Sequence, residues 1–282
     1  PHPKALLKTA IRSDSIPQLL ESLALARSKS PDTFSSFLAS TLVATISAGS
    51  VPLTTYLLET ENAGGSLSQV TAQVVSTAPS IGLLEVLVRH GWDINHQDPK
   101  DIMHKGQRLI DRAVQDEELV MWLVEHGARV DFPDVEPDLE RLEDWPAPLL
   151  ETCAALGSLK TFVYLLGKGA RLGRRTLHRA AGAGAQVGAE PDSLSASDDG
   201  NISPRGGSQD GEDRSRNYKK QRELILRYLV DELRVNINQI DTDVPRGHWF
   251  YGSPINYAAK EKKGAAVVRW LLEKGADPTI KS

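Results

Sequence analysis

The chain has 282 residues, 40% of them hydrophobic and only 6% aromatic, with a formal net charge of −4 at pH 7. This mild negative charge excludes the broadly basic surface that most nucleic-acid-binding domains need, so no nucleic-acid partner is expected. The single cysteine, Cys153, excludes an internal disulfide framework and favours a reducing compartment inside the cell, cytoplasmic or nuclear. No run approaches the roughly 18 consecutive apolar residues of a membrane span, so no membrane association is expected.

Segments with helical periodicity follow one another in pairs along the whole chain. Apolar residues recur in them at i, i+3 and i+4, which predicts helices with one buried face. The expected pairs are 4–12 with 16–26, 34–49 with 52–60, 67–78 with 82–95, 108–115 with 118–131, 146–157 with 160–172, 174–184 with 219–233, and one within 252–278. Because an isolated pair cannot bury its apolar faces, such pairs need neighbours stacked on both sides.

The clearest pair lies in Gly252–Pro278, which has the sequence GSPINYAAKEKKGAAVVRWLLEKGADP. Ser253 and Pro254 supply an N-cap hydroxyl and a proline at the first helical position, where a missing N–H is harmless. Gly264 permits a sharp turn before the second helix. Gly275 follows a basic last turn, which is the usual place for a glycine at a helix C-terminus.

Helix-ending glycines recur at Gly91, Gly127 and Gly169, which are separated by 36 and 42 residues, so the loop 132–145 in the second interval is expected to carry about six extra residues. With the motif TLHRAA at 176–181 and the ending LLEKGAD at 271–277, the sequence resembles the ankyrin repeat family. The resemblance implies about seven repeats in one domain over 1–282, clear from residue 82 onward and degenerate before it. The implied fold is all-α, an ankyrin-repeat solenoid of stacked antiparallel helix pairs with β-hairpin finger loops. Irregular paired-helix repeats are the alternative for 1–80.

The sixth repeat is interrupted by residues 185–217, which are rich in glycine, serine and aspartate and have the composition of a disordered insertion. Ser203 precedes a proline there, as in proline-directed phosphorylation sites. The basic run 214–222 is either a solvated linker or a patch for nuclear import or anionic lipid. The glycines of 182–188 imitate a phosphate-binding loop, but they follow a helix, so we expect them to end that helix and open a linker.

No constellation of residues indicates catalysis, so the chain is not expected to be an enzyme or to bind a cofactor, metal or small-molecule substrate. Cys153 stands at a small core position without a basic neighbour, which is typical of an inert buried thiol. The place of His178 in the ankyrin-like motif implies a hydrogen bond to the loop of the neighbouring repeat. No second ligand at helical spacing supports a metal site there. His96 and His104 share a loop with Asp98, where a solvated loop is favoured over a metal cluster.

Loop aromatics without a helical core to enter are candidates for partner binding, since tryptophan and tyrosine are enriched among binding hot spots. With one flanking arginine, the candidates are Trp92, Trp145, Arg246, His248, Trp249, Phe250 and Tyr251. In the competing interpretation, Trp249 or Tyr251 folds back to cover the preceding repeat. Binding is favoured for Trp249 and Phe250.

The ankyrin resemblance implies a non-catalytic module that binds another protein through its concave face and finger loops. Residues 1–141 contain 12 basic and 19 acidic residues, whereas 142–282 contain 21 and 18, so the first half favours a partner with a basic surface. The alternative is an accessory regulatory or substrate-recruiting segment of a larger enzyme or signalling protein, favoured by a chain that begins at Pro1. Asn95 resembles the position hydroxylated in ankyrin domains.

Overall fold

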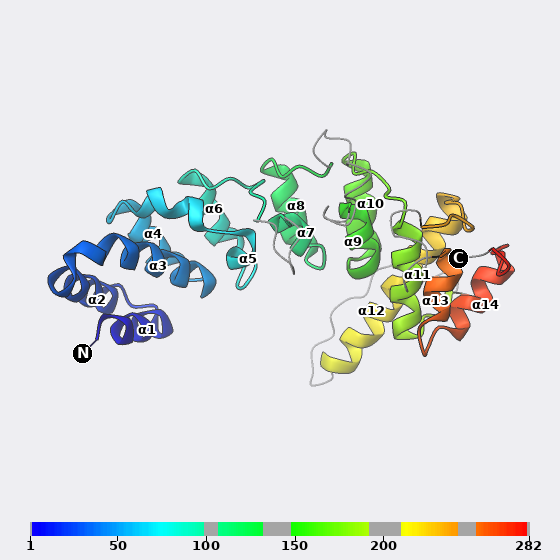
Figure 1. Cartoon of the computed structure of the whole chain (residues 1–282), viewed down its shortest axis with the longest axis horizontal. Helices are drawn as coiled ribbons and strands as arrows, with labels where there is room; N and C mark the ends of the chain where they lie inside the picture. The colour runs from blue at the N-terminus through cyan, green and yellow to red at the C-terminus, as the bar shows by residue number, and fades with distance from the viewer. Residues whose placement is uncertain (1, 99–106, 132–147, 192–209, 242–251, 281–282) are drawn as a thin grey trace. The chain divides into compact units, whose positions relative to one another are not determined.

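The computed structural model of the chain describes residues 2–98, 107–131, 148–191, 210–241 and 252–280 (Figure 1). These residues form helices and turns, with no strand among them, so the described part of the chain is all-α as predicted. Their contacts group into two compact units. The first unit contains Pro1–Ala113 and Glu118–Ala128, and the second contains Val114–Glu117 and Arg129–Ser282.

Helix pairs build the first unit in two rows. The helices are α1 (Pro3–Ser13), α2 (Ile16–Lys29), α3 (Phe34–Ser47), α4 (Val51–Glu59), α5 (Ala72–Val75), α6 (Ile81–Arg89), α7 (Leu109–Arg112) and α8 (Glu117–Glu125). The first residue of α8, Glu117, is assigned to the second unit. In one row α1, α3, α5 and α7 contact one another in series, and in the other α2, α4 and α6 do the same. The predicted helix over 67–78 is largely wrong, because a 3-10 turn occupies Ala63–Gln69 and the Thr71 side chain caps a helix of only four residues.

The second unit repeats this two-row arrangement. It contains α9 (Leu149–Leu156), α10 (Leu159–Gly167), α11 (Thr176–Val187), α12 (Asp210–Arg227), α13 (Pro254–Ala259) and α14 (Ala265–Glu273). Helices α9, α11 and α13 are in contact in series, α10 contacts α12, and α14 contacts both α13 and α11. None of the described helices is long and apolar enough to cross a membrane.

Four helices end in the same way, and this confirms the helix-ending glycines predicted from the sequence. Gly91, Gly127, Gly169 and Gly275 have φ values of 91°, 96°, 96° and 95°. In each case the next residue donates its N–H to a leucine carbonyl five positions earlier, the bonds being Trp92 to Leu87 (2.9 Å), Ala128 to Leu123 (2.8 Å), Ala170 to Leu165 (3.0 Å) and Ala276 to Leu271 (2.9 Å). This is the Schellman arrangement, and all four leucines are 0% exposed.

Two endings have a left-handed residue other than glycine, Asp14 after α1 and Arg234 after the helix that α12 begins. Arg234 has a φ of 50°, and the Val235 N–H donates to the Leu229 carbonyl oxygen at 3.0 Å, six positions earlier. A π-helical turn at Tyr228–Glu232 supplies the extra residue. The segment 235–241 therefore follows a left-handed helix end, as the glycine endings do, although its hydrogen bond spans six positions and its left-handed residue is an arginine.

Two glycines at the end of α10 should respond to alanine with changes in stability of opposite sign. We expect Gly169→Ala to lower the free energy of unfolding by about 1–2 kcal/mol, because a φ of 96° is strained for an L-residue. Gly167→Ala, in the last turn of α10, is expected to raise it by about 0.5–1 kcal/mol through helix propensity. No atom lies within 4 Å of the added Cβ at either position, so contacts do not enter the comparison. Urea unfolding followed by circular dichroism measures both, and changes of the same sign would contradict the assignment.

The predicted bounds of the insertion, 185–217, are too wide at both ends. Helix α11 continues to Val187 and α12 begins at Asp210, while 192–209 lie outside the described residues. The glycines around 182–188 do not all end the helix either. Gly184 lies inside α11, where an added Cβ would stand 2.8 Å from the Leu226 Cδ1 of α12, so this glycine permits two helices to approach closely.

Candidate functional site

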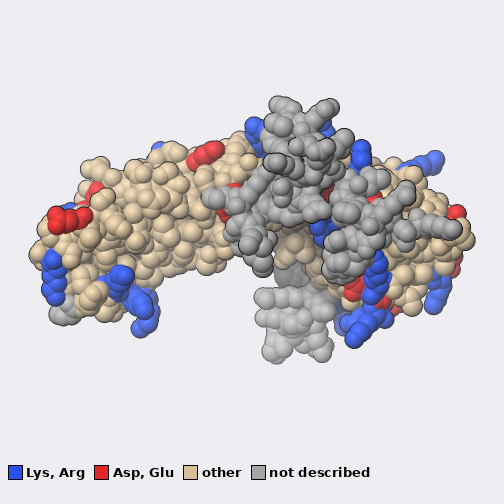
Figure 2. All heavy atoms as spheres, in the orientation of Figure 1, with Lys and Arg blue, Asp and Glu red and all other residues tan. Residues whose placement is uncertain are grey.

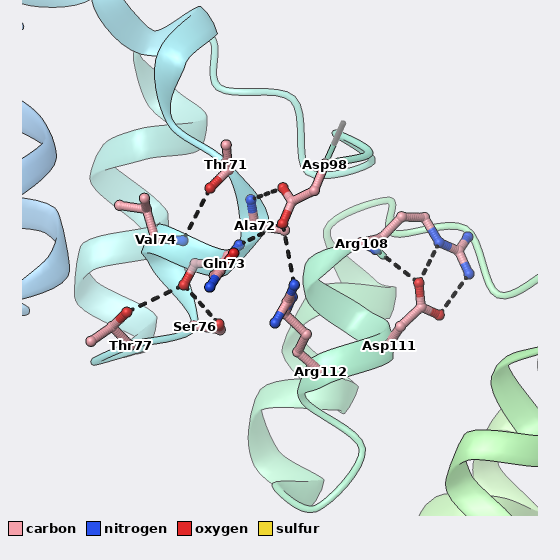
Figure 3. Close-up of polar contacts among 10 residues, drawn as sticks. All are labelled: Thr71, Ala72, Gln73, Val74, Ser76, Thr77, Asp98, Arg108, Asp111 and Arg112. Carbon is pink, nitrogen blue, oxygen red and sulfur yellow. Dashed lines mark hydrogen bonds and ion pairs between the residues drawn. The ribbon is translucent and has the colours of Figure 1, made fainter. Parts of the chain in front are cut away.

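A buried carboxylate, Asp98, ties three parts of the first unit together (Figure 3). It lies on the loop after α6 and is 5% exposed. Its oxygens accept the backbone N–H groups of Ala72 and, at 2.9 Å, of Gln73, at the start of α5. The Arg112 guanidinium on α7 approaches the same carboxylate at 3.4 Å. Asp98 therefore joins a loop to the first helices of the pairs before and after it.

Asp241 holds the equivalent place in the second unit. It stands six residues after Val235, as Asp98 stands six residues after Trp92, each counted from the residue that follows a left-handed helix end. The carboxylate of Asp241 is 0% exposed, contacts the Arg175 Nε at 3.0 Å and accepts a hydrogen bond from the Tyr257 hydroxyl. Burial, and then this hydrogen bond, raise the pKa of Tyr257, so the hydroxyl stays a donor at neutral pH.

Both carboxylates stand at the base of a loop whose ends are fastened together. The Asp98 N–H donates to the Gln107 carbonyl oxygen at 3.2 Å, and the Asp241 N–H donates to the Gly252 carbonyl oxygen at 3.0 Å. These bonds bracket residues 99–106 and 242–251, which lie outside the described residues. The two loops thus leave the scaffold at equivalent, closed bases.

His178 strengthens the second base. The residue is 0% exposed, and its Nε2 lies 3.1 Å from the Gly252 carbonyl oxygen. Because a carbonyl oxygen only accepts hydrogen bonds, Nε2 carries the proton. The predicted hydrogen bond from His178 to the loop of the neighbouring pair is confirmed. Its ring also packs edge-on against Tyr257, with 5.1 Å between ring centroids.

One asparagine connects each loop to the next helix end. The Asn95 side chain donates to the Gly127 carbonyl oxygen at 2.9 Å, and the Asn238 side chain donates to the Gly275 carbonyl oxygen at 3.2 Å. Asn95 therefore has a structural role between successive pairs. Its hydroxylation stays a prediction.

The expectation that Trp92 is an exposed contact residue is wrong. The residue is 4% exposed, and its indole N–H donates to the Val70 carbonyl oxygen at 2.9 Å. Aligning the four glycine endings explains the burial, because Trp92 occupies the position that Ala128, Ala170 and Ala276 hold elsewhere, and those three are 4–6% exposed. A larger side chain in the same buried place remains part of the core.

The remaining candidates lie outside the described residues and stay predictions. They are Trp145, Ser203, Arg246, His248, Trp249, Phe250 and Tyr251. His104 lies there as well, so the loop it shares with His96 is described only in part. Both oxygens of Asp98 on that loop are engaged by N–H donors. No group of three or more metal-ligating side chains occurs within the ranges that the structure describes.

The basic run 214–222 is neither a linker nor a free basic patch in its C-terminal part. Arg222 is 1% exposed and donates from its guanidinium to the carbonyl oxygens of Ala154, at 2.9 Å, and Gly157, at the end of α9. The Tyr218 hydroxyl donates to the Ala155 carbonyl oxygen at 3.0 Å. Helix α12 thus supplies the C-terminal cap of α9, a role that fits the carbonyl end of the helix dipole.

Cys153 is buried on α9 below this cap, as predicted for an inert thiol. Burial raises its pKa to about 12, although the charge of Arg222 opposes the shift. At neutral pH the thiolate that a nucleophile requires is therefore almost absent.

Sequence reasoning missed the two loop carboxylates, although the chain carried a signal for them. The segments WDINHQD (92–98) and VNINQID (235–241) share an asparagine and an aspartate at the same spacing after a helix end. Aligned as repeats, they would have marked Asp98 and Asp241 as equivalent residues. In the comparisons with known proteins, no family model, no curated protein and no solved structure matches the chain.

Proposed function

We propose that the chain is a non-catalytic, intracellular protein-interaction module of the ankyrin-repeat type. In this proposal, stacked helix pairs carry finger loops along a concave face, and a partner protein binds there. The observation that supports it best is the repeated loop base. At Asp98 and at Asp241 one buried carboxylate contacts two successive first helices, and one backbone hydrogen bond closes the loop.

A closed base favours binding because it reduces the conformational entropy that a loop loses when it engages a partner. The loop between Asp241 and Gly252 carries the aromatic run His248–Tyr251. Ring residues of this kind supply large contact areas with few rotatable bonds. We infer that Trp249 and Phe250 are the main anchors, flanked by Arg246, His248 and Tyr251. Trp145 contributes from the loop before α9.

The non-catalytic part of the proposal is supported by what the buried titratable groups do. Asp98, Asp241 and His178 each hold a loop to a helix, and the Cys153 thiol is protonated. A general acid, base or nucleophile needs a reacting group that is free to meet a substrate. The buried titratable groups named above are instead held within the helical scaffold.

The test is the double substitution Trp249→Ala with Phe250→Ala. We expect it to weaken binding of the partner at least about 30-fold, because a single buried aromatic anchor typically contributes 2 kcal/mol or more. The melting temperature should stay unchanged, since these residues lie on a loop whose base is held by other groups. Proteins captured by the wild-type chain from a cell lysate are quantified by mass spectrometry against the variant.

The matched control removes two exposed apolar side chains of the same unit that lie outside this loop. Leu156 and Leu172 are each 41% exposed, and replacing both with alanine should leave capture intact. If the aromatic variant captures the same proteins as the wild type, the aromatic finger is not the contact surface. If the control loses them equally, binding depends on general surface hydrophobicity and not on the finger.

A further inference from the structure

Three first helices carry a side chain at one shared position, four residues after the N-cap. These residues are Arg112 on α7, Arg179 on α11 and Tyr257 on α13, after the N-caps Arg108, Arg175 and Ser253. Arg112 approaches the carboxylate of Asp98, and Tyr257 donates to that of Asp241. At this position a hydrogen-bond donor therefore meets the carboxylate of the loop that precedes its own helix.

Arg179 lacks such a carboxylate because the loop before α11 is too short to carry one. Only five positions separate Ala170, the residue after the helix end, from the N-cap Arg175. The corresponding separations are 16 positions from Trp92 to Arg108 and 18 from Val235 to Ser253. The short loop has the sequence ARLGRR and contains no acidic residue. Among the described residues the Arg179 side chain makes no hydrogen bond or ion pair.

Within the described ranges, no surface carboxylate contacts the Arg179 guanidinium. The two nearby carboxylates are buried and engaged, Asp241 by Arg175 and Tyr257, and Glu151 by the Arg175 N–H at 2.8 Å. Arg179 itself is exposed, as are Arg171 and Arg174 on the short loop. Figure 2 shows lysine and arginine side chains spread over the visible face of the second unit.

The surroundings of Arg179 also disfavour its positive charge. Burial, and then the charge of Arg175, lower its pKa, while Glu151, Tyr257 and Asp241 oppose the shift. The guanidinium remains charged at neutral pH, and an anion placed against it would relieve both effects.

We propose that Arg179 binds a carboxylate from an acidic segment of the partner protein, which takes the place that Asp98 and Asp241 hold at the equivalent positions. The choice of a carboxylate follows from these two positions, where the anion is an aspartate. A guanidinium matches a carboxylate with two parallel N–H···O bonds, which gives direction as well as attraction. This inference rests on the proposed function and adds to it the chemistry of one contact on the partner.

The experiment uses the full chain and a fluorescein-labelled peptide of alternating glutamate and aspartate, eight residues long, with a glutamine–asparagine peptide as the uncharged control. We expect the wild type to bind the acidic peptide in low salt, measured by fluorescence anisotropy, and to release it as ionic strength rises. Arg179→Gln should weaken this binding about 5- to 10-fold, the range for one charge-assisted contact. Its melting temperature should equal that of the wild type.

Arg269→Gln is the matched control, because Arg269 is an exposed arginine on α14, which leaves the total charge of the two variants equal. It should bind the acidic peptide as the wild type does. Equal affinity of Arg179→Gln and the wild type would overturn the inference. A fall of several degrees in the melting temperature of Arg179→Gln would also overturn it, since an internal carboxylate would then already occupy the position.

The inference and the proposed function can fail separately. If Trp249→Ala with Phe250→Ala loses the captured proteins while Arg179→Gln keeps both them and the acidic peptide, the module binds partners but Arg179 is not a contact. If Arg179→Gln loses the acidic peptide while the aromatic variant captures everything that the wild type does, Arg179 is an anion site and the finger proposal is wrong.

Discussion

Replacing Arg222 with alanine is expected to lower the free energy of unfolding by about 3 kcal/mol. The substitution removes the buried guanidinium together with the two hydrogen bonds that it donates. The Ala154 and Gly157 carbonyl oxygens at the end of α9 then lose these donors. A hydrogen bond to a charged group contributes about 1.5–3 kcal/mol, and the cavity left by the side chain adds to the loss. The stacking of Tyr218 on the guanidinium, 4.8 Å from its ring centroid, is lost as well.

Arg227→Ala on the same helix is the control. Its side chain is 41% exposed, and its contact with Asp231, 3.9 Å away, is of the surface kind that contributes between 0 and about 1 kcal/mol. Urea unfolding followed by circular dichroism compares the two variants. If both lose the same small amount of stability, α12 is not fastened by Arg222. The cap that it forms on α9 would then have no energetic weight.

Arg222 also shows why part of this fold could not be predicted. In the sequence it belongs to a run with five basic residues in nine, 214–222, and such runs are normally solvated. Its burial depends on carbonyl groups at the end of α9, 65–68 residues earlier in the chain. No local sequence pattern predicts that α12 will cap the C-terminal end of α9.

Apart from the His178 contact, which the ankyrin resemblance implied across 74 positions, the features that were predicted correctly depend on nearby residues. The glycine endings are formed by hydrogen bonds across five residues, and the Ser253–Pro254 start of α13 is fixed within one turn. The loop carboxylates connect residues farther apart, as in the bond from Gln73 to Asp98 across 25 positions. Periodicity located the helices and the stacked pairs, but not the groups that fasten the loops to them.

Trp92 was also predicted wrongly from its local sequence, because a residue expected at the surface is buried. A tryptophan beside a glycine on a loop resembles a surface contact when it is considered alone. Its equivalence to Ala128, Ala170 and Ala276 becomes visible only when the helix endings are superposed. Repeat alignment would therefore have improved the prediction of the candidate site more than any composition argument about loop aromatics.

His178 should make the stability of the second unit depend on pH. Burial lowers the pKa of its imidazole from 6.5 to about 4, although Asp241 and the backbone carbonyls of Gln239 and Gly252 oppose the shift. Arg175 adds to the lowering, so the positive and negative neighbours partly cancel and burial dominates. The folded protein therefore keeps the imidazole neutral between pH 6.5 and 4, while the unfolded chain takes up a proton in the same range.

The sign follows from the proton count. Because the unfolded state binds more protons over this window, the contribution of His178 to stability is complete above pH 6.5 and is lost as the pH falls to 4. A difference of 2.5 between the two pKa values corresponds to about 3 kcal/mol. The loss comes from burying a charged imidazolium, since Nε2 keeps its proton and continues to donate to the Gly252 carbonyl oxygen.

His178→Gln separates this effect from the titration of the carboxylates. A glutamine amide can donate to the Gly252 carbonyl oxygen, as Nε2 does, but it does not titrate. The difference in unfolding free energy between wild type and variant, measured in urea at several values between pH 7 and 4, should shrink or reverse by about 3 kcal/mol as the pH falls. A constant difference over that range would mean that the imidazole ionises as easily in the folded protein as in the unfolded chain.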